Sequence, residues 1–387
     1  MSTNSPPLES TGTQRSATGS NSVSVSSSNA APAGPKRIDE YLKEVLTKGG
    51  SDLHFIAGDP PRIRLYGELQ PLRNEILEPR FVEELLREIM PRTAVLRLEE
   101  KNGADFAHII PGISRFRVNI MRHLMGLGAV FRAIPSKAKT LDDLKMPDAV
   151  RNLCKLNSGL ILVTGKTGSG KSTTLAAMID DINQRMKGHI ITIEDPIEFV
   201  HQRKSSLISQ REIGVHTQSF SSALHSALRE DPDVVLVGEM RDYETISIAV
   251  TAAEMGILVM GTLHTNGAAP TVDRIINSFP ADKQAQVRAM LSTSLRGVVS
   301  QQLIPTKGKP GRVAAMEIMV NTPAVANLIR QGKLDQLENT IQSGASLGMR
   351  TMDSAIQELL DKAFISGRNA YLKAINKNKF EAVKDQN

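Results

Sequence analysis

Two patterns of hydrophobic positions divide the chain. Between residues 38 and 134, short apolar runs, several of them alternating with polar side chains, are typical of half-buried strands. These runs cover residues 52–56, 61–67, 104–107, 115–120 and 128–134. Apolar residues at three- and four-residue spacing predict a helix that begins near Ile38 and ends at Gly49, and a second helix covers residues 79–90. The pattern therefore predicts a small α+β domain over residues 36–134.

The second pattern follows a Lys- and Pro-rich stretch, residues 135–147, which we predict to be a linker. Runs that are apolar on both faces cover residues 160–164, 190–194, 233–237 and 256–262, and predicted helices begin at Lys171, Ser219, Tyr243 and Ala269. Strands of this kind need helices on both faces of a parallel sheet. Residues 148–387 are therefore predicted to form an α/β domain, with a helical C-terminus after Pro323.

The first 35 residues have a different composition. After Met1 their only large aliphatic residues are Leu8, Val23 and Val25, and Ser is abundant, so we predict a disordered tail. The tail lacks the basic start and the apolar core of a secretory signal. No apolar run approaches the roughly 20 residues of a membrane span, so we expect a cytoplasmic protein.

Composition narrows the classes of function. The chain has 387 residues and a net charge of +6, with 4% aromatic residues, no Trp and a single cysteine, Cys154. Few rings are available for stacking on bases, and the charge excess is scattered, so nucleic acid is not expected as a partner. One cysteine cannot form an intrachain disulfide or a multi-cysteine zinc site, so no zinc is expected and Cys154 is interpreted as a core residue.

A phosphate-binding motif provides the strongest chemical signal. Residues 165–172 read GKTGSGKS and match G-x-x-x-x-G-K-[ST], directly after an apolar run and directly before a predicted helix. Glycines let backbone N–H groups converge on phosphate oxygens, Lys171 would reach the β- and γ-phosphates, and Ser172 would offer a hydroxyl to Mg²⁺. The predicted nucleotide-binding residues are Gly165, Lys166, Thr167, Gly168, Ser169, Gly170, Lys171, Ser172 and Thr173.

Polar residues follow three further predicted strands. Carboxylates cluster over residues 193–199, a run of aliphatic residues ends in Gly-Glu at Glu239, and His264 closes another strand. Ligands of open α/β sheets bind at the carboxyl ends of the strands, so the two acidic clusters are interpreted as metal and water partners. For His264, spacing alone leaves a structural role and a phosphate-sensing role equally open.

The ordered motifs resemble those of the PilT family of type IV pilus retraction ATPases, within the secretion-type hexameric ATPase superfamily. They occupy residues 51–54, 115–119, 129–132, 165–172, 193–199, 228–233, 238–242, 261–265 and 347–349, and the resemblance covers nearly all of the chain from Ile38. It implies a PAS-like N-terminal domain, a RecA-like ATPase domain and a homohexamer that uses ATP and Mg²⁺ to retract pili. It also implies an inner-membrane platform protein as partner, other pilus ATPases as further contacts, and a location at the pilus base on the inner membrane.

The resemblance assigns roles to individual residues. Glu198 would be the general base that orients the attacking water, Glu239 and Ser172 would hold Mg²⁺, and His264 would sense the γ-phosphate. Glu194 and Asp195 would be supporting polar groups. Three arginines of the first domain, Arg115, Arg117 and Arg132, are candidates for arginine fingers across the domain or subunit boundary, with a solvated strand face as the alternative.

Departures from the family pattern limit what is implied. Lys166 stands where the family usually has Pro, and Ala326 and Gln331 replace Arg and Glu in the family's retraction motif. Hydrolysis is expected to survive these changes, whereas a main and an accessory retraction motor both stay open. Pilus-extension and type II secretion ATPases are disfavoured because they carry a four-cysteine zinc site. A nucleic-acid translocase and a nucleotide-binding regulator without turnover are the remaining alternatives.

Overall fold

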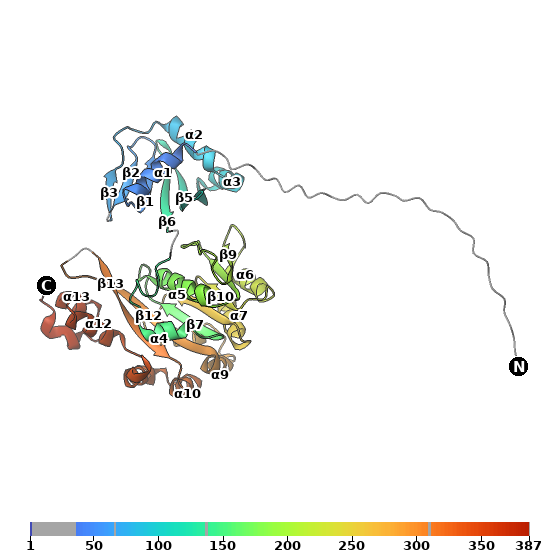
Figure 1. The fold of residues 1–387 in the computed structure, drawn as a ribbon, viewed down its shortest axis with the longest axis vertical. Coiled ribbons are helices and arrows are strands. Elements are labelled where there is room, and N and C mark those ends of the chain that lie inside the picture. The colour runs from blue at the N-terminus through green and yellow to red at the C-terminus, as the bar shows by residue number, and fades with distance from the viewer. Residues whose placement is uncertain (2–35, 66, 136–137, 309–310, 387) are drawn as a thin grey trace.

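The computed structural model describes residues 1, 36–65, 67–135, 138–308 and 311–386 (Figure 1). The predicted tail lies outside the described residues except for Met1. The described residues form two sheets, one of six strands and one of seven. Among the described residues, no helix combines the length and the apolar character that crossing a bilayer requires.

The six-stranded sheet is antiparallel throughout, in the order β3-β2-β1-β6-β5-β4. Its elements are α1 (Ile38–Thr47), β1 (Asp52–Ile56), β2 (Arg62–Leu65), β3 (Glu68–Pro71), α2 (Pro79–Ile89), α3 (Arg92–Lys101), β4 (Gly103–Ile110), β5 (Ser114–His123) and β6 (Gly126–Ile134). Side chains alternate between the faces of β5: Phe116, Val118 and Ile120 are buried, and Arg117 and Asn119 are exposed. The predicted alternation is confirmed, and it builds a core of this region's own.

The seven-stranded sheet has the order β13-β12-β7-β11-β10-β8-β9 and is parallel except for β13. Its strands are β7 (Gly159–Thr164), β8 (His189–Glu194), β9 (Leu207–Glu212), β10 (Val234–Val237), β11 (Leu258–Leu263), β12 (Leu295–Pro305) and β13 (Arg312–Val320). The helices are α4 (Asp148–Leu153), α5 (Lys171–Arg185), α6 (Phe220–Ala227), α7 (Tyr243–Glu254), α8 (Ala268–Asn277), α9 (Gln284–Ser294), α10 (Pro323–Gln331), α11 (Leu337–Ser343), α12 (Met352–Asp361) and α13 (Gly367–Lys373). Short 3₁₀ turns at Leu334–Gln336, Ala345–Leu347 and Lys377–Val383 complete the helical C-terminus that the sequence predicts.

Both faces of this sheet are covered, as the doubly apolar strands require. On β7, Leu160 and Leu162 pack in one cluster with residues of α6 to α9, while Ile161 and Val163 pack in another with α4 and α5. Cys154 is buried in the second cluster, as predicted. Residues of the predicted linker also pack there: Leu141 and Met146 are 3% and 5% exposed.

Sequence reasoning missed several elements, and each omission has a physical cause. The short edge strand β3 is exposed at every position, and β9, with only Glu212 buried, lacks the apolar run used to recognise parallel strands. In β12 the polar residues Ser300, Gln301 and Gln302 interrupt the apolar sequence, and β13 is the antiparallel edge strand. Helix α3 has only two buried apolar positions, Ala94 and Leu98, and α4, with 6 residues, is too short to show a helical repeat of apolar positions.

Strand order brings the predicted chemistry together. The strands β7, β11, β10 and β8 are consecutive in the sheet and parallel to one another. The phosphate loop follows β7, His264 follows β11, Glu239 follows β10 and the acidic cluster follows β8. All four segments therefore leave the same edge of the sheet, because the carboxyl ends of parallel strands coincide.

Candidate active site

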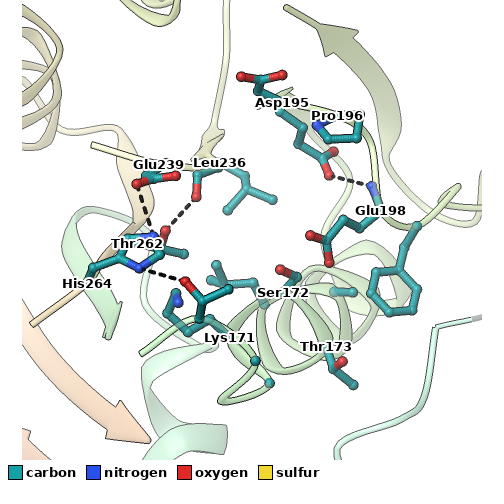
Figure 2. A pocket seen from close by; sticks show the side chains of 18 of the residues that line it. Lys171, Ser172, Thr173, Asp195, Pro196, Glu198, Leu236, Glu239, Thr262 and His264 are labelled. Carbon is teal, nitrogen blue, oxygen red and sulfur yellow. Dashed lines mark hydrogen bonds and ion pairs between the residues drawn. The ribbon is translucent and has the colours of Figure 1, made fainter. Parts of the chain in front are cut away.

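A cavity of about 470 Å³ opens at this edge of the sheet (Figure 2). Its lining includes Thr167, Gly168, Gly170, Lys171, Ser172, Thr173, Glu194, Asp195, Glu198, His201, Glu239, Arg241, Thr262, His264 and Arg312. The structure thus brings together most of the predicted loop residues, Glu198, Glu239 and His264. Gly165, Lys166 and Ser169 are not in the lining: Gly165 and Ser169 are buried and Lys166 is exposed.

The phosphate loop has a shape that only glycines at fixed positions permit. Gly165, Gly168 and Gly170 have φ of 138°, 77° and 91°, in the region that side chains avoid. A Cβ on Gly165 would lie 2.3 Å from the backbone oxygen of Gln301, whereas a Cβ on Gly168 would meet nothing within 4 Å. Helix α5 begins at Lys171, so its N-terminal N–H groups and positive dipole end face the cavity.

Lys171 is held against the loop that precedes it. Its Nζ donates to the backbone oxygens of Gly165 at 2.9 Å and Lys166 at 3.3 Å, and the residue is 8% exposed. Burial lowers the pKa of Lys171, against the opposing influence of the Glu239 and Glu198 carboxylates. A buried cation at the N-terminus of a helix is suited to bind an anion with several negative charges.

Gln301, a residue that sequence reasoning missed, fixes the shape of the loop from β12. It is 3% exposed; its Nε2 donates to the backbone oxygen of Ser169 at 2.6 Å, and its Oε1 accepts from the Thr174 hydroxyl at 2.8 Å. One side chain therefore ties the loop to the first turn of α5. A polar pair, Gln301-Gln302, inside an otherwise apolar run was the signal available in the sequence, because buried amides require hydrogen-bond partners.

Glu239 lies on one side of the cavity, where Arg241 and His264 contact its carboxylate. Its Oε1 is 3.0 Å from His264 Nε2, and its carboxylate receives Arg241 Nε at 2.5 Å and Nη2 at 2.6 Å. Burial alone would raise the pKa of Glu239, but the Arg241 hydrogen bond and the charges of His264, Arg241 and Lys171 outweigh burial and lower it. Glu239 is therefore a carboxylate at neutral pH.

Glu198 lies on the opposite side of the cavity from Glu239, with Ser172 between them (Figure 2). Glu198 is exposed, and its backbone N–H donates to Glu194 Oε2 at 3.4 Å. Glu194 also accepts from the Thr192 hydroxyl at 2.6 Å and from Gln210 Nε2 at 3.2 Å, and burial raises its pKa. Glu194 is thus a half-buried support for the loop, and Glu198 presents an exposed carboxylate to the cavity.

His264 connects two of the segments. While its Nε2 contacts Glu239, its Nδ1 is 3.5 Å from the hydroxyl of Thr167 in the phosphate loop. The ring therefore lies between a carboxylate and the phosphate loop. This position is suited to a group that responds to whatever the loop binds.

The three arginines predicted as fingers do not line this cavity. Arg117 and Arg132 line a separate hollow of about 410 Å³ on the first sheet, where Arg132 Nε lies 2.7 Å from Asp52 Oδ1. Their side chains are 48% and 66% exposed. Arg115 is paired within the chain: its Nη2 lies 2.7 Å from Glu212 Oε2 on β9. Within one chain, none of the three completes the site.

Two more residues of the cavity were missed. His201 contributes a ring whose Nδ1 is buried without a hydrogen-bond partner among the described residues, and burial lowers its pKa to about 4. Arg312, on β13, lies at the same cavity and also borders an adjoining one beside α12. Arg312 lies on the antiparallel strand β13, and His201 lies beyond the acidic cluster in the loop between β8 and β9, so neither is placed by the ends of the parallel strands.

Known proteins are similar to this chain over most of its length. Residues 29–363 match the family described as type II/IV secretion system protein, which is most of the chain. The chain belongs to this family. The type IV pilus retraction ATPase PilT of Pseudomonas aeruginosa is 52% identical over 337 residues, 87% of this chain and 98% of that protein. A twitching motility protein of Neisseria gonorrhoeae is 49% identical over 321 residues, 83% of this chain and 86% of that protein.

A solved structure supports the fold of this family member. The crystal structure of the pilus retraction motor PilT with bound ADP superposes with a TM-score of 0.84 at 43% identity, covering 89% of this chain and 98% of that one. The resemblance found in the sequence and the α/β class are therefore confirmed. That relative contains bound ADP, which is consistent with nucleotide binding by the phosphate loop of this chain.

Proposed function

We propose that this chain is an ATP-hydrolysing motor that retracts type IV pili and so drives twitching motility. The observation that carries the proposal is the single cavity where the phosphate loop, two carboxylates and a histidine converge from four neighbouring strands. The names of two relatives similar along most of their length supply the biological setting. We further propose that residues 36–134 form a PAS-like domain, residues 135–147 a linker, and residues 148–387 a RecA-like domain.

The residues of the cavity have separate tasks in this proposal. Lys171 and the loop N–H groups bind the phosphates of ATP. Glu198 accepts the proton of the attacking water and orients it, and His264 senses the γ-phosphate through its contacts with Glu239 and Thr167. An exposed carboxylate in the lining of the cavity, opposite Glu239, is suited to that task because a water molecule can approach it.

Mg²⁺ fits the donor set. Ser172, Glu198 and Glu239 supply a hydroxyl and two carboxylates to one cavity, and Mg²⁺ prefers oxygen ligands. Ser172 and Glu239 are the residues that would hold it. When bound, Mg²⁺ neutralises negative charge on the phosphates of ATP.

We propose a homohexamer with nucleotide between adjacent subunits, at the inner-membrane base of the pilus, acting on a platform protein and alongside other pilus ATPases. Arg117 and Arg132 are exposed on the first sheet, so both guanidinium groups are available to a neighbouring subunit. Guanidinium groups placed across such a boundary would stabilise the charge that develops on the transferred phosphoryl group. No zinc and no nucleic acid enter this scheme.

Glu198→Gln tests the hydrolytic proposal. We expect steady-state release of phosphate to fall about 100-fold or more, while binding of a fluorescent ATP analogue is retained, because an amide cannot accept the proton. Glu254→Gln, an exposed carboxylate at the end of α7, is the matched control. Unchanged turnover in Glu198→Gln would contradict the assigned role.

In cells, deletion of a main retraction motor should produce hyperpiliated, non-motile bacteria, whereas loss of an accessory motor should leave motility largely intact.

A further inference from the structure

A buried ion pair joins the two sheets next to the linker. Arg115 Nη2, on β5, lies 2.7 Å from Glu212 Oε2, on β9, and the two side chains are only 15% and 8% exposed. Arg115 pairs in register with Ile134, the last residue of β6, and the linker follows directly. The ion pair therefore lies close to the linker that connects the two sheets. Any movement of one sheet relative to the other would occur about this linker.

The same carboxylate oxygen of Glu212 also binds the backbone of the loop that follows β8 and carries Glu198, here called the catalytic loop. Glu212 Oε2 accepts the backbone N–H of Ile197 at 3.2 Å, and Ile197 directly precedes Glu198 in the sequence. Ile197 is 3% exposed, so this N–H has little access to water as an alternative partner. Glu198 itself donates its N–H to Glu194. Because Glu194 and Glu212 are register partners on β8 and β9, two neighbouring carboxylates hold consecutive N–H groups of the loop.

Arg115 depends strongly on this contact. Its Nε is buried and has no hydrogen-bond partner among the described residues, so the Nη2–Glu212 bond is the main polar contact of a largely buried cation. A buried charge that loses its partner is costly. Movement of the first sheet away from β9 would therefore have to be accompanied by rearrangement of Glu212, and with it of the bond to Ile197.

We propose that Arg115 is a positioning residue for hydrolysis, acting through Glu212 and the backbone of Ile197 on the carboxylate of Glu198. Rotation of the first domain that breaks the ion pair releases the loop and slows hydrolysis in the same subunit. The coupling works in both directions, so a nucleotide that fixes the loop also favours the paired domain arrangement. This role differs from that of an arginine finger, which touches the phosphates directly. The inference rests on the proposed role of Glu198.

A double-mutant cycle tests the coupling in the full-length chain. Arg115→Ala and Glu212→Ala should each lower kcat about tenfold, because the loop that carries Glu198 moves. The affinity for a fluorescent ATP analogue should change less than about twofold, because the phosphate loop keeps its position. The double variant should be no worse than about twofold below either single variant, since both changes break one connection. Arg115→Lys should recover part of kcat, because an ammonium group can still pair with Glu212.

Several outcomes would overturn the inference. An arginine finger predicts that Arg115→Ala lowers kcat far more than Glu212→Ala and that the two losses multiply. Breaking a buried pair can also unfold the chain, so Glu212→Gln, which keeps an acceptor for Ile197, and thermal unfolding of every variant accompany the cycle. Arg97→Ala, an exposed arginine on α3, is the matched control.

Glu198→Gln, measured in parallel, separates the two proposals. If turnover survives in Glu198→Gln, the assigned role of Glu198 is wrong, whatever the cycle gives. If Glu198→Gln abolishes turnover while the folded Glu212→Ala and Glu212→Gln variants keep wild-type kcat, the positioning role of Arg115 and Glu212 is wrong. A fall in kcat in both Glu212→Ala and Arg115→Ala without a change in nucleotide affinity supports it.

Discussion

Gln301 offers a direct test of how the phosphate loop is held in shape. The structure places its amide between the backbone oxygen of Ser169 and the hydroxyl of Thr174, with bonds of 2.6 Å and 2.8 Å, at a site that is 3% exposed. Gln301→Ala removes the amide, so the backbone oxygen of Ser169 and the hydroxyl of Thr174 each lose this hydrogen bond inside the protein. Each such group costs about 1–3 kcal/mol, so the total for the two groups is about 2–6 kcal/mol.

The loss of these two hydrogen bonds should lower two measured quantities. The free energy of unfolding should fall, and the affinity for ATP should fall by about tenfold or more, since 1.4 kcal/mol corresponds to a factor of ten and the affected carbonyl lies inside the loop. Isothermal titration with nucleotide and thermal unfolding with and without nucleotide measure the two effects. Gln302→Ala is the matched control, because the next side chain along β12 points to the opposite face of the sheet.

A second variant distinguishes loop geometry from loss of volume. Gln301→Glu keeps the size of the side chain and an acceptor for Thr174, but it places a carboxylate oxygen where Nε2 lies 2.6 Å from the Ser169 oxygen. Repulsion there should weaken ATP binding although no cavity is created. If both Gln301 variants bind ATP within about twofold of the unmodified chain, the loop does not depend on Gln301 and the reasoning fails.

Two further predictions follow from local geometry and burial. In a nucleotide titration, Gly165→Ala should weaken ATP binding far more than Gly168→Ala. Both positions have positive φ, but of the two only the Cβ at 165 would meet a backbone atom, the oxygen of Gln301 at 2.3 Å. Equal losses of ATP affinity in the two variants would contradict this prediction. Burial lowers the pKa of His201 to about 4, below its ordinary value near 6.5, so its contribution to stability is complete above pH 6.5 and is lost as the pH falls towards 4. Between pH 7 and pH 5 the unmodified chain should therefore lose about 2 kcal/mol more stability than His201→Gln, measured by urea unfolding; parallel losses would refute the assignment.

The sequence by itself was sufficient for the parts of this protein that depend on local pattern. A doubly apolar strand followed by glycines and Lys171 specifies both the strand and the loop, because the glycine positions determine the backbone and the helix start determines the dipole. The positions of Glu198, Glu239 and His264 at one edge also followed, since parallel strands align their carboxyl ends and each of the three residues lies in the segment that follows such a strand. The alternation in β5 likewise separated the buried Phe116, Val118 and Ile120 from the exposed Arg117.

Only the tertiary structure decided the contacts between segments far apart in the chain. Gln301 and Ser169 are 132 residues apart, and Arg115 and Glu212 are 97 apart. Strand order and register determine such pairs, and the residues near each partner carry no local pattern that indicates the other. Arg115 illustrates the limit: the sequence places an arginine on a strand face, but its partner depends on where the first sheet meets β9. Long-range packing determines which of several similar polar side chains becomes buried. Once a polar side chain is buried, the loss of its hydrogen-bond partner is costly, so that contact contributes strongly to stability.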